Sequence, residues 1–376
     1  MIDCATLDRH LLNAGVSFFT GVPDSCIKPW IDYLLDKRPN DHVIATNEGE
    51  ALAIAAGYHL ATGKPAGVYL QNAGFGNLVN PLSSVVDEFV YKIPILLIIS
   101  WRGKPGVKDE PQHRRMGENM EPILRTFGVQ YSIFDMESLR SIMEAATKSL
   151  NAGHPYALLL RKGNLEPYSI LKRPSDGAGL LSRSEAIQLI SDHFGRNAVY
   201  FATTGKTSRE LYVLRDISHD DHSRDFLNVG GMGFVSSLAL GFALRSDKRT
   251  IVLDGDGSVL MHLGNLATIG HYRPPNIIHF ILDNNSHDSV GGLATVSETV
   301  DFARIAEGAG YRRALTVASS NELNCALTEV TGQQGPTLIR VKVRKGASPD
   351  MPRPSMSPQD RKTLLMARFS SSHSSS

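Results

Sequence analysis

The feature that most constrains the fold of this sequence is an alternation of short β-branched runs with helical segments, repeated in both halves. The first half contains the runs "VSFFTGVP", "HVIAT", "PAGVYLQN" and "IPILLIIS", separated by helical patterns such as "EGEALAIAAGYHLA". The second half contains "NAVYFATTG", "TIVLDG", "NIIHFILD" and "PTLIRVKV", separated in the same way. This βαβ pattern is typical of parallel, doubly wound sheets. It predicts an α/β protein with two such domains.

The predicted domain limits follow from a change in composition. The stretch "LKRPSDGAGLLSR" combines Pro, Gly and charge, which is typical of a connection, so we expect a linker over residues 171–183. The two α/β domains then cover residues 1–170 and 184–346, and residues 347–376 form a Pro-containing C-terminal tail that ends in "SSSHSSS" and is expected to fray. "AAGYHLATGKPAGVYLQN" and "LALGFALRSDKRTIVLDG" resemble each other. This similarity indicates either one fold used twice or a chance likeness between two βαβ units.

Charge and cysteine content exclude several classes of protein. The 39 Lys and Arg residues nearly balance 38 Asp and Glu residues, so no basic field favours binding to nucleic acid or to a membrane surface. Three widely spaced cysteines, Cys4, Cys26 and Cys325, argue against a disulfide framework and a zinc site. The N-terminus does not resemble a signal peptide, and no apolar run approaches the length of a membrane span. We therefore expect a cytoplasmic protein.

A carboxylate between two glycines indicates a metal and phosphate site. Asp256 follows a predicted strand, between Gly255 and Gly257, and Asn284 ends the next predicted strand. Parallel strands present their carboxyl ends at one sheet edge, where ligands bind. Mg²⁺ prefers oxygen ligands, and the glycines allow a phosphate to approach backbone N–H groups. Alternatively, the glycines form only a turn, and Asn284 and Asn285 cap a loop.

Two other nucleotide-binding motifs do not fit. "TTGKTS" ends like a phosphate-binding P-loop, but the glycine required five positions before Gly205 is Tyr200. "NVGGMGFVSS" lacks the GxGxxG pattern and does not follow a strand. A nicotinamide-dependent oxidoreductase is therefore poorly supported.

The motif "GDG", followed after a strand–helix–strand span by "LDNN", resembles the thiamine diphosphate-dependent enzymes. The resemblance implies that Mg²⁺ binds Asp256, Asn284 and the carbonyl of Ser286, and that the metal holds the diphosphate of thiamine diphosphate. It also implies a pyrimidine-binding first domain, a diphosphate-binding second domain and no central third domain. The expected cofactor contacts are Gly74, Gly205, Lys206, Thr207, Met232, Gly255, Gly257 and Ser258.

Two of these contacts have an alternative interpretation. In related enzymes a bulky apolar residue lies beneath the cofactor and bends it, and Met232 in "GGMGF" has that position. Otherwise Met232 is a core methionine at the start of a helix. Lys206 is equally well explained as an exposed lysine at the start of a helix.

Thiamine chemistry also requires a carboxyl group that bonds the pyrimidine nitrogen. Apolar surroundings suit it, because burial raises the pKa of a carboxyl group. Glu48 ends the run "HVIAT" and opens a helix of small residues, and Gly57 and Tyr58 reproduce the spacing of the family helix. The resemblance therefore favours Glu48 over Glu50 as the catalytic residue. The alternative is a glutamate that only favours the helix dipole.

The family resemblance has a consequence for assembly. Active sites of this family form between the first domain of one subunit and the second domain of another, which implies a homo-oligomer of at least two chains. A catalytically inactive subunit would lack Glu48 or Asp256, and both are present.

The stretches "GVPDS", "QNAGFGNLVNPLSS", "WRGKPGVKDEPQHRRMG", "TGKTSREL" and "MPRPSMSP" resemble the phosphonopyruvate decarboxylases, whose near relatives are the sulfopyruvate decarboxylases. The resemblance implies decarboxylation of 3-phosphonopyruvate to phosphonoacetaldehyde and CO₂, in the biosynthesis of phosphonate antibiotics. Sulfopyruvate or another 2-oxoacid is the alternative substrate.

The basic stretch after "IPILLIIS" supports an anionic substrate, because a loop of this kind could close over an oxoacid and pair with its charges. A solvated charged loop is the alternative. The expected substrate contacts are Asp24, Ser25, Gln71, Asn72, Lys108, His113 and Arg114.

Two residues depart from the family pattern. Where relatives usually have Asn-Gly and later an aromatic residue, this chain has Asn285 and His287. We expect a positive φ at Asn285, which asparagine tolerates better than most residues. His287 could alter protonation of the product or the substrate preference.

Overall fold

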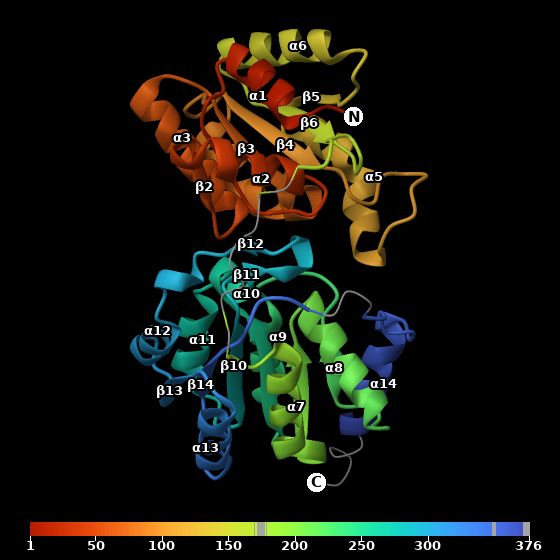
Figure 1. Cartoon of the computed structure of the whole chain (residues 1–376), viewed down its shortest axis with the longest axis vertical. Coiled ribbons are helices and arrows are strands. Elements are labelled where there is room, and N and C mark those ends of the chain that lie inside the picture. The colour runs from red at the N-terminus through yellow and green to blue at the C-terminus, as the bar shows by residue number, and fades with distance from the viewer. Residues whose placement is uncertain (169, 171–176, 178, 348–350, 371–376) are drawn as a thin grey trace. The chain divides into compact units, whose positions relative to one another are not determined.

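The computed structural model describes residues 1–168, 170, 177, 179–347 and 351–370. The chain divides into two compact units, Met1–Arg173 and Pro174–Ser376 (Figure 1). Residues 171–176 and 178 of the predicted linker lie outside the described residues. Helix α7 (Arg183–Phe194) begins at the last residue of that predicted linker.

The first unit contains a six-stranded parallel sheet with the order β2-β1-β3-β4-β6-β5. Its strands are β1 (Phe19–Gly21), β2 (His42–Ile44), β3 (Ala66–Gln71), β4 (Ile95–Ser100), β5 (Gln130–Ile133) and β6 (Tyr156–Leu160). Its helices are α1 (Cys4–Asn13), α2 (Lys28–Lys37), α3 (Glu48–Thr62), α4 (Phe75–Pro81), α5 (Pro111–Thr126) and α6 (Leu139–Asn151). Strand β4 is buried along its whole length, as expected for a central strand of a parallel sheet.

The second unit contains a parallel six-stranded sheet with the order β13-β14-β10-β9-β7-β8. Its strands are β7 (Ala198–Ala202), β8 (Asp225–Leu227), β9 (Arg249–Gly255), β10 (Ile277–Asp283), β13 (Arg313–Val317) and β14 (Thr337–Lys342). A two-stranded antiparallel pair joins β11 (Ser286–His287) to β12 (Leu293–Ala294). Besides α7, its helices are α8 (Lys206–Ile217), α9 (Val235–Ala243), α10 (Asp256–Met261), α11 (Asn265–Tyr272), α12 (Phe302–Gly308), α13 (Ser320–Thr331) and α14 (Pro358–Ser370).

The two sheets have the same topology, which confirms the predicted fold class. Counting the strands of each sheet from its first, both sheets have the order 2-1-3-4-6-5 when the second is read from β8. The weak internal similarity of the sequence therefore corresponds to one strand order used twice.

Alternating side chains of the second sheet pack into two cores, one on each face. Ile251 and Leu253 of β9 pack with residues of α7, α8 and α13, whereas Val252 packs with residues of α9, α11 and α12. A period of two is what a strand covered on both faces requires. The helices on each side of the sheet are visible in Figure 1.

Part of the C-terminal tail, which was expected to fray, forms a helix. Residues 358–370 form α14, in which Leu365 is buried in the core beside α9, and the ring of Phe369 meets the ring of Phe242 edge to face. The prediction of a frayed tail was wrong for this helix, because Leu365 and Phe369 pack against the hydrophobic core and hold the helix in place. Residues 348–350 and 371–376 of the predicted tail lie outside the described residues.

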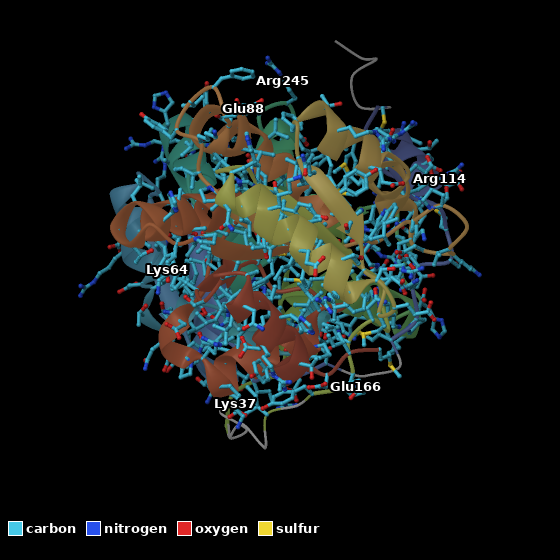
Figure 2. The ribbon with its side chains drawn as sticks, turned by 90° about the horizontal axis from the view of Figure 1, so that it is seen from above. Lys37, Lys64, Glu88, Arg114, Glu166 and Arg245 are labelled. Carbon is cyan, nitrogen blue, oxygen red and sulfur yellow. The ribbon has the colours of Figure 1, made fainter. Side chains whose placement is uncertain are left out.

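Charged side chains such as Lys64 and Arg114 extend outward from the ribbon (Figure 2). Among the residues that the structure describes, no helix combines the length and the apolar character needed to cross a membrane.

Candidate active site

Glu48 lies at the carboxyl edge of the first sheet, at the first position of α3. Its side chain is only 4% exposed, and the amide of Asn77 on α4 donates a hydrogen bond to Oε2 at 2.6 Å. Burial raises the pKa of Glu48, and the Asn77 bond opposes that rise. A Cβ atom on Gly74 would lie 1.9 Å from Oε1, so only glycine fits beside this carboxyl group.

Glu50 has a different role, although it is only two residues away. It is exposed, and its Oε2 accepts hydrogen bonds from the backbone N–H and the hydroxyl of Thr46, at 2.8 and 2.5 Å. These contacts close the first turn of α3 in the manner of a helix cap. The geometry therefore suits Glu48 for chemistry better than it suits Glu50.

Asp24 and Gln71 come together at the same edge of the first sheet. Asp24 is buried, and its carboxylate accepts hydrogen bonds from Gln71 Nε2 at 2.5 Å and from Ser100 Oγ at 2.6 Å. Neighbouring Ser25 is exposed. Asp24 thus orients the amide of Gln71, which sequence reasoning did not anticipate.

Asn72 is fully buried and both ends of its amide are in use. Its Nδ2 donates to the carbonyl of Arg102 at 2.8 Å, and its Oδ1 accepts from the backbone N–H of Arg102 at 3.0 Å. The guanidinium of Arg102 in turn binds both carboxylate oxygens of Asp109, at 2.7 and 2.5 Å. These contacts fix the loop that follows β4.

The predicted basic residues of this loop differ in their surroundings. His113 is partly buried, and among the described residues no group hydrogen-bonds to its Nδ1. Burial, followed by the nearby charge of Arg102, lowers the pKa of His113, which favours a neutral ring. Lys108 is exposed, and Arg114 is exposed with Nε 2.8 Å from Glu118 Oε1. Of these three predicted residues, His113 is the one that has a buried nitrogen without a hydrogen-bond partner in the described structure.

Asp256 lies at the carboxyl edge of the second sheet, at the first position of α10, and is 2% exposed. Its Oδ2 accepts hydrogen bonds from Thr295 Oγ1 at 2.5 Å and from Ser297 Oγ at 2.9 Å. Burial, assisted by the charge of Asp283, raises the pKa of Asp256 to about 6. Within the described part of the chain, no cationic side chain forms an ion pair with it.

Asn284 follows β10, and a series of hydrogen bonds between charged side chains fixes the orientation of its amide. Its Nδ2 donates to Asp288 Oδ2 at 2.7 Å, and its Oδ1 accepts from the N–H of Ser286 at 3.0 Å. Asp288 also binds Arg183 Nη1 at 3.0 Å, and Arg183 holds Glu210 through two further bonds of 2.8 and 2.9 Å. Sequence reasoning missed Arg183, Glu210 and Asp288.

Asn285 adopts a φ of +53°, which confirms the expected left-handed backbone. The following residue, Ser286, has a buried hydroxyl with no hydrogen-bond partner among the described residues. This turn delivers Ser286 to the same sheet edge as Asp256.

The oxygen atoms at this edge fit a divalent cation. Asp256 offers a buried carboxylate with no cationic partner among the described side chains, and Asn284 and Ser286 lie on the adjacent turn. Carboxylate, amide and carbonyl oxygens are the ligands that Mg²⁺ prefers. These residues therefore fit a magnesium ion, and the energetic cost of burying Asp256 gives a physical reason for one to bind.

The remaining predicted cofactor residues surround the same edge. Gly205 and Lys206 open α8, and Thr207 in its first turn is buried. Met232 is partly exposed in the loop before α9. Ser258 is buried. Its hydroxyl forms a hydrogen bond with Thr203 Oγ1 at 2.9 Å and accepts another from the N–H of Gly233 at 3.1 Å.

His287 covers the second glycine of the "GDG" motif. A Cβ atom on Gly257 would lie 2.5 Å from Cε1 of His287, so the imidazole requires glycine at this position. Burial lowers the pKa of His287 to about 4, which favours a neutral ring. Gly255 immediately precedes Asp256, at the end of β9.

Comparisons with known proteins cover both units. The family model of the thiamine pyrophosphate enzyme N-terminal TPP binding domain matches residues 6–121, and that of the C-terminal TPP binding domain matches residues 204–341. The chain is 36% identical to a phosphonopyruvate decarboxylase of Streptomyces viridochromogenes, over 96% of this chain and 93% of the relative. This chain belongs to the thiamine pyrophosphate enzyme family.

Two further relatives refine this result. A phosphonopyruvate decarboxylase of Streptomyces hygroscopicus is 36% identical, over 96% of this chain and 92% of the relative. A sulfopyruvate decarboxylase of Methanosarcina acetivorans is 27% identical, over 94% of this chain and 96% of the relative. The protein is a thiamine diphosphate-dependent 2-oxoacid decarboxylase, and thus a carboxy-lyase.

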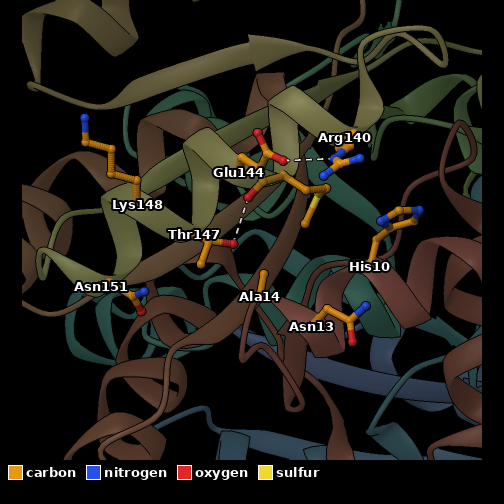
Figure 3. Close-up of a pocket in the computed structure, with 9 residues that line it drawn as sticks. His10, Asn13, Ala14, Arg140, Glu144, Thr147, Lys148 and Asn151 are labelled. Carbon is orange, nitrogen blue, oxygen red and sulfur yellow. Dashed lines mark hydrogen bonds and ion pairs between the residues drawn. The ribbon is translucent and has the colours of Figure 1, made fainter.

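A groove of about 430 Å³ lies elsewhere on this decarboxylase, between α1 and α6 (Figure 3). Asn13 and Lys148 line it, and Arg140 pairs with Glu144 at 3.0 Å on one wall. The residues that line it come from the end of α1 and from nearly the whole length of α6. Glu48 is not among them, so the groove is separate from the candidate active site.

Proposed function

We propose that this enzyme uses thiamine diphosphate and Mg²⁺ to decarboxylate 3-phosphonopyruvate, giving phosphonoacetaldehyde and CO₂ for the biosynthesis of phosphonate antibiotics. The observation that carries the proposal is the full-length similarity to two phosphonopyruvate decarboxylases at 36% identity. The similarity to the sulfopyruvate decarboxylase is lower, at 27%. Sulfopyruvate is the alternative substrate, because that similarity also extends over nearly the whole chain.

Glu48 is the residue we assign to proton exchange with the pyrimidine ring of the cofactor. When bound, thiamine diphosphate would supply a nucleophilic carbanion and would take up the electron pair that stays behind on the substrate carbon when CO₂ departs. Asn77 occupies Oε2 of Glu48, so Oε1 is the oxygen that would carry the shared proton. The raised pKa of Glu48 brings its protonation equilibrium closer to neutral pH, where a general acid or base is most effective.

Asp256, Asn284 and the carbonyl of Ser286 are the residues we assign to Mg²⁺. The oriented amide of Asn284, fixed by Asp288, supports this assignment. The diphosphate would contact the residues that open α8 and α10, namely Gly205, Lys206, Thr207, Gly255, Gly257 and Ser258, with Gly74 and Met232 contacting the rest of the cofactor. We further propose that Glu48 and Asp256 act on one cofactor molecule within a homo-oligomer of at least two chains.

The anionic substrate would be bound at the carboxyl edge of the first sheet. Gln71, oriented by Asp24, and His113, with its unsatisfied nitrogen, are the strongest candidates for direct contact. Ser25, Lys108 and Arg114 are exposed, and the two cations would contribute through their charge. Asn72 would act indirectly, by holding the loop at Arg102.

The test compares the two oxoacids directly. Purified protein is incubated with thiamine diphosphate, Mg²⁺ and either 3-phosphonopyruvate or sulfopyruvate, and aldehyde formation is followed by a coupled reduction. The Glu48→Gln protein, purified identically, measures background decarboxylation. We expect a higher kcat/KM for 3-phosphonopyruvate, and an equal or higher value for sulfopyruvate would overturn the substrate assignment.

A further inference from the structure

Ser297 lies at the centre of a buried cluster of oxygen atoms beside Asp256. Its side chain is 0% exposed. Its Oγ lies 2.9 Å from Asp256 Oδ2, 3.0 Å from Asp283 Oδ1 and 2.7 Å from Asn285 Oδ1. The hydroxyl of Thr295 lies 2.8 Å away. One hydroxyl group thus touches four oxygen atoms from four different residues.

The number of protons in this cluster is smaller than the number of acceptors. A serine hydroxyl carries one proton, so Ser297 can donate to only one of these oxygens at a time. Two carboxylates, those of Asp256 and Asp283, share this space, since both lie within 3.0 Å of Ser297 Oγ. Arg340 neutralises Asp283 through Nε at 2.7 Å, which leaves Asp256 as the carboxylate that needs a cation.

Ser297 also connects three segments of the second unit. Asp256 follows β9, Asp283 ends β10, and Thr295 follows the β11–β12 pair. Because Asn284 and Ser286 lie between β10 and β12, a contact from Ser297 to Asp256 closes the turn that carries these two residues. Arg340 reinforces the closure, since its Nη2 donates to the carbonyl of Ser297 at 3.4 Å.

We propose that Ser297, assisted by Thr295, is a positioning residue for the metal site, because it holds the turn at residues 284–297 against Asp256. This inference rests on the proposed role of Asp256, Asn284 and Ser286 as magnesium ligands. Without the hydroxyl of Ser297, the cluster loses one of its few protons, and the mutual repulsion among the oxygens of Asp256, Asp283 and Asn285 is less well compensated. The turn then opens, and the metal must supply the energy to close it.

Metal affinity is the measurement that tests this role. Binding of Mn²⁺, as a paramagnetic substitute for Mg²⁺, is followed by electron paramagnetic resonance in the presence of thiamine diphosphate. In Ser297→Ala we expect the Kd for Mn²⁺ to rise by about 10- to 100-fold, the range typical when a partner of a metal ligand is removed. Ser297→Thr restores the hydroxyl and should recover most of the affinity.

Thr299→Ala is the matched control. Thr299 lies on the same short helical turn, is exposed, and its hydroxyl contacts only the carbonyl of Val296 in the described structure. We expect its Mn²⁺ affinity and its kcat to equal those of the wild type. Thr295→Val is the second test variant, should Ser297→Ala fail to fold as judged by circular dichroism, and we expect a smaller loss of Mn²⁺ affinity.

The dependence of turnover on metal separates positioning from a general loss of structure. If Ser297 positions the turn, Ser297→Ala requires more Mg²⁺ for half-maximal activity but regains nearly the wild-type kcat at saturating Mg²⁺. Unchanged Mn²⁺ affinity in folded Ser297→Ala or Thr295→Val, or a low kcat at every metal concentration, would overturn the inference. If wild type and Asp256→Ala bind Mn²⁺ equally, the proposed metal site itself is wrong.

Discussion

Glu48 and Asp256 occupy comparable places in the two units but have different surroundings. Each is the first residue of a helix at the carboxyl edge of a parallel sheet, and burial raises the pKa of each. Within the described residues, the side chain of Glu48 accepts a hydrogen bond from the amide of Asn77. Asp256 receives two from hydroxyls and lies close to a second carboxylate, Asp283.

This difference separates two uses of a buried carboxyl group. A carboxyl group with few polar neighbours can exchange a proton, because both of its charge states are accessible near neutral pH. A carboxylate within a cluster of oxygens is better stabilised by a cation, because one added proton can pair with only one of these oxygens, whereas a metal ion can bind several at once. The neighbours of the carboxyl group, more than its burial, distinguish the residue that we propose for catalysis from the one that we propose as a metal ligand.

The largest expected effect separates these two roles. Glu48→Gln should lower kcat by about 10³-fold or more, within the upper range for loss of a general acid or base, while thiamine diphosphate still binds. Steady-state kinetics and the quenching of tryptophan fluorescence by the cofactor measure the two properties. Asp256→Ala should instead lose cofactor and metal binding together. If Glu48→Gln retained wild-type turnover, its assigned role would be refuted.

The second prediction concerns the stability of the metal-free protein. The pKa of Asp256 in the folded protein, about 6, exceeds its ordinary value of 3.8. The folded state therefore holds this proton more tightly than the unfolded state, and the contribution of Asp256 to stability is lost as pH rises from about 4 through 6. The full loss is about 3 kcal/mol, since each pKa unit corresponds to about 1.4 kcal/mol.

Asp256→Asn cannot ionise and should not show this loss. Urea denaturation of both metal-free proteins at pH 5 and pH 8 measures the difference. We expect the free energy of unfolding of the variant, relative to that of the wild type, to increase from pH 5 to pH 8. If the difference in stability between Asp256→Asn and the wild type did not vary with pH, the pKa of Asp256 would not be raised in the folded protein.

A smaller effect is expected at Asn77. Its hydrogen bond lowers the pKa of Glu48 against the effect of burial, so Asn77→Ala should raise that pKa further. The acidic limb of the kcat/KM profile should then move to higher pH, and turnover at pH 7 should fall about tenfold, as expected for loss of a bond to a charged group. Asn80→Ala on the same helix α4, where the side chain is exposed, is the control and should match the wild type.

The smallest effect is expected at the exposed basic residues beyond β4. Arg114 forms an exposed ion pair with Glu118. The interaction free energy of an exposed ion pair is small, because water and salt screen the two charges. Arg114→Ala should therefore change kcat/KM for 3-phosphonopyruvate by less than about twofold, whereas His113→Ala should reduce it considerably more. An Arg114→Ala effect as large as that of His113→Ala would show that the loop closes over the substrate in solution.

The sequence predicted the features that depend on local pattern. Most strands, the position of Glu48 at the start of a helix, and the positive φ of Asn285 follow from neighbouring residues and short spacings, whereas β5, β8 and β13 were not predicted. The contacts around the two carboxyl groups did not follow. Asn77 lies 29 residues from Glu48, and Ser297 lies 41 residues from Asp256.

Long-range contacts of this kind leave no periodic signal, because a single serine or asparagine in a loop is compatible with many environments. The Arg183–Asp288 ion pair, whose partners lie 105 residues apart, could not be predicted from the sequence for the same reason. Helix α14 was missed because prolines precede it and few of its residues are apolar. In each case the information lies in the tertiary arrangement and not in the local sequence.

The strand order shared by the two sheets separates the scaffold from the chemistry of its edges. The same arrangement of strands places Glu48 at the carboxyl edge of one sheet and Asp256 at the carboxyl edge of the other. An amide contacts Glu48, whereas two hydroxyls contact Asp256. Substitutions in the loops that leave the strands can therefore change the chemistry at either edge without changing the sheet beneath it.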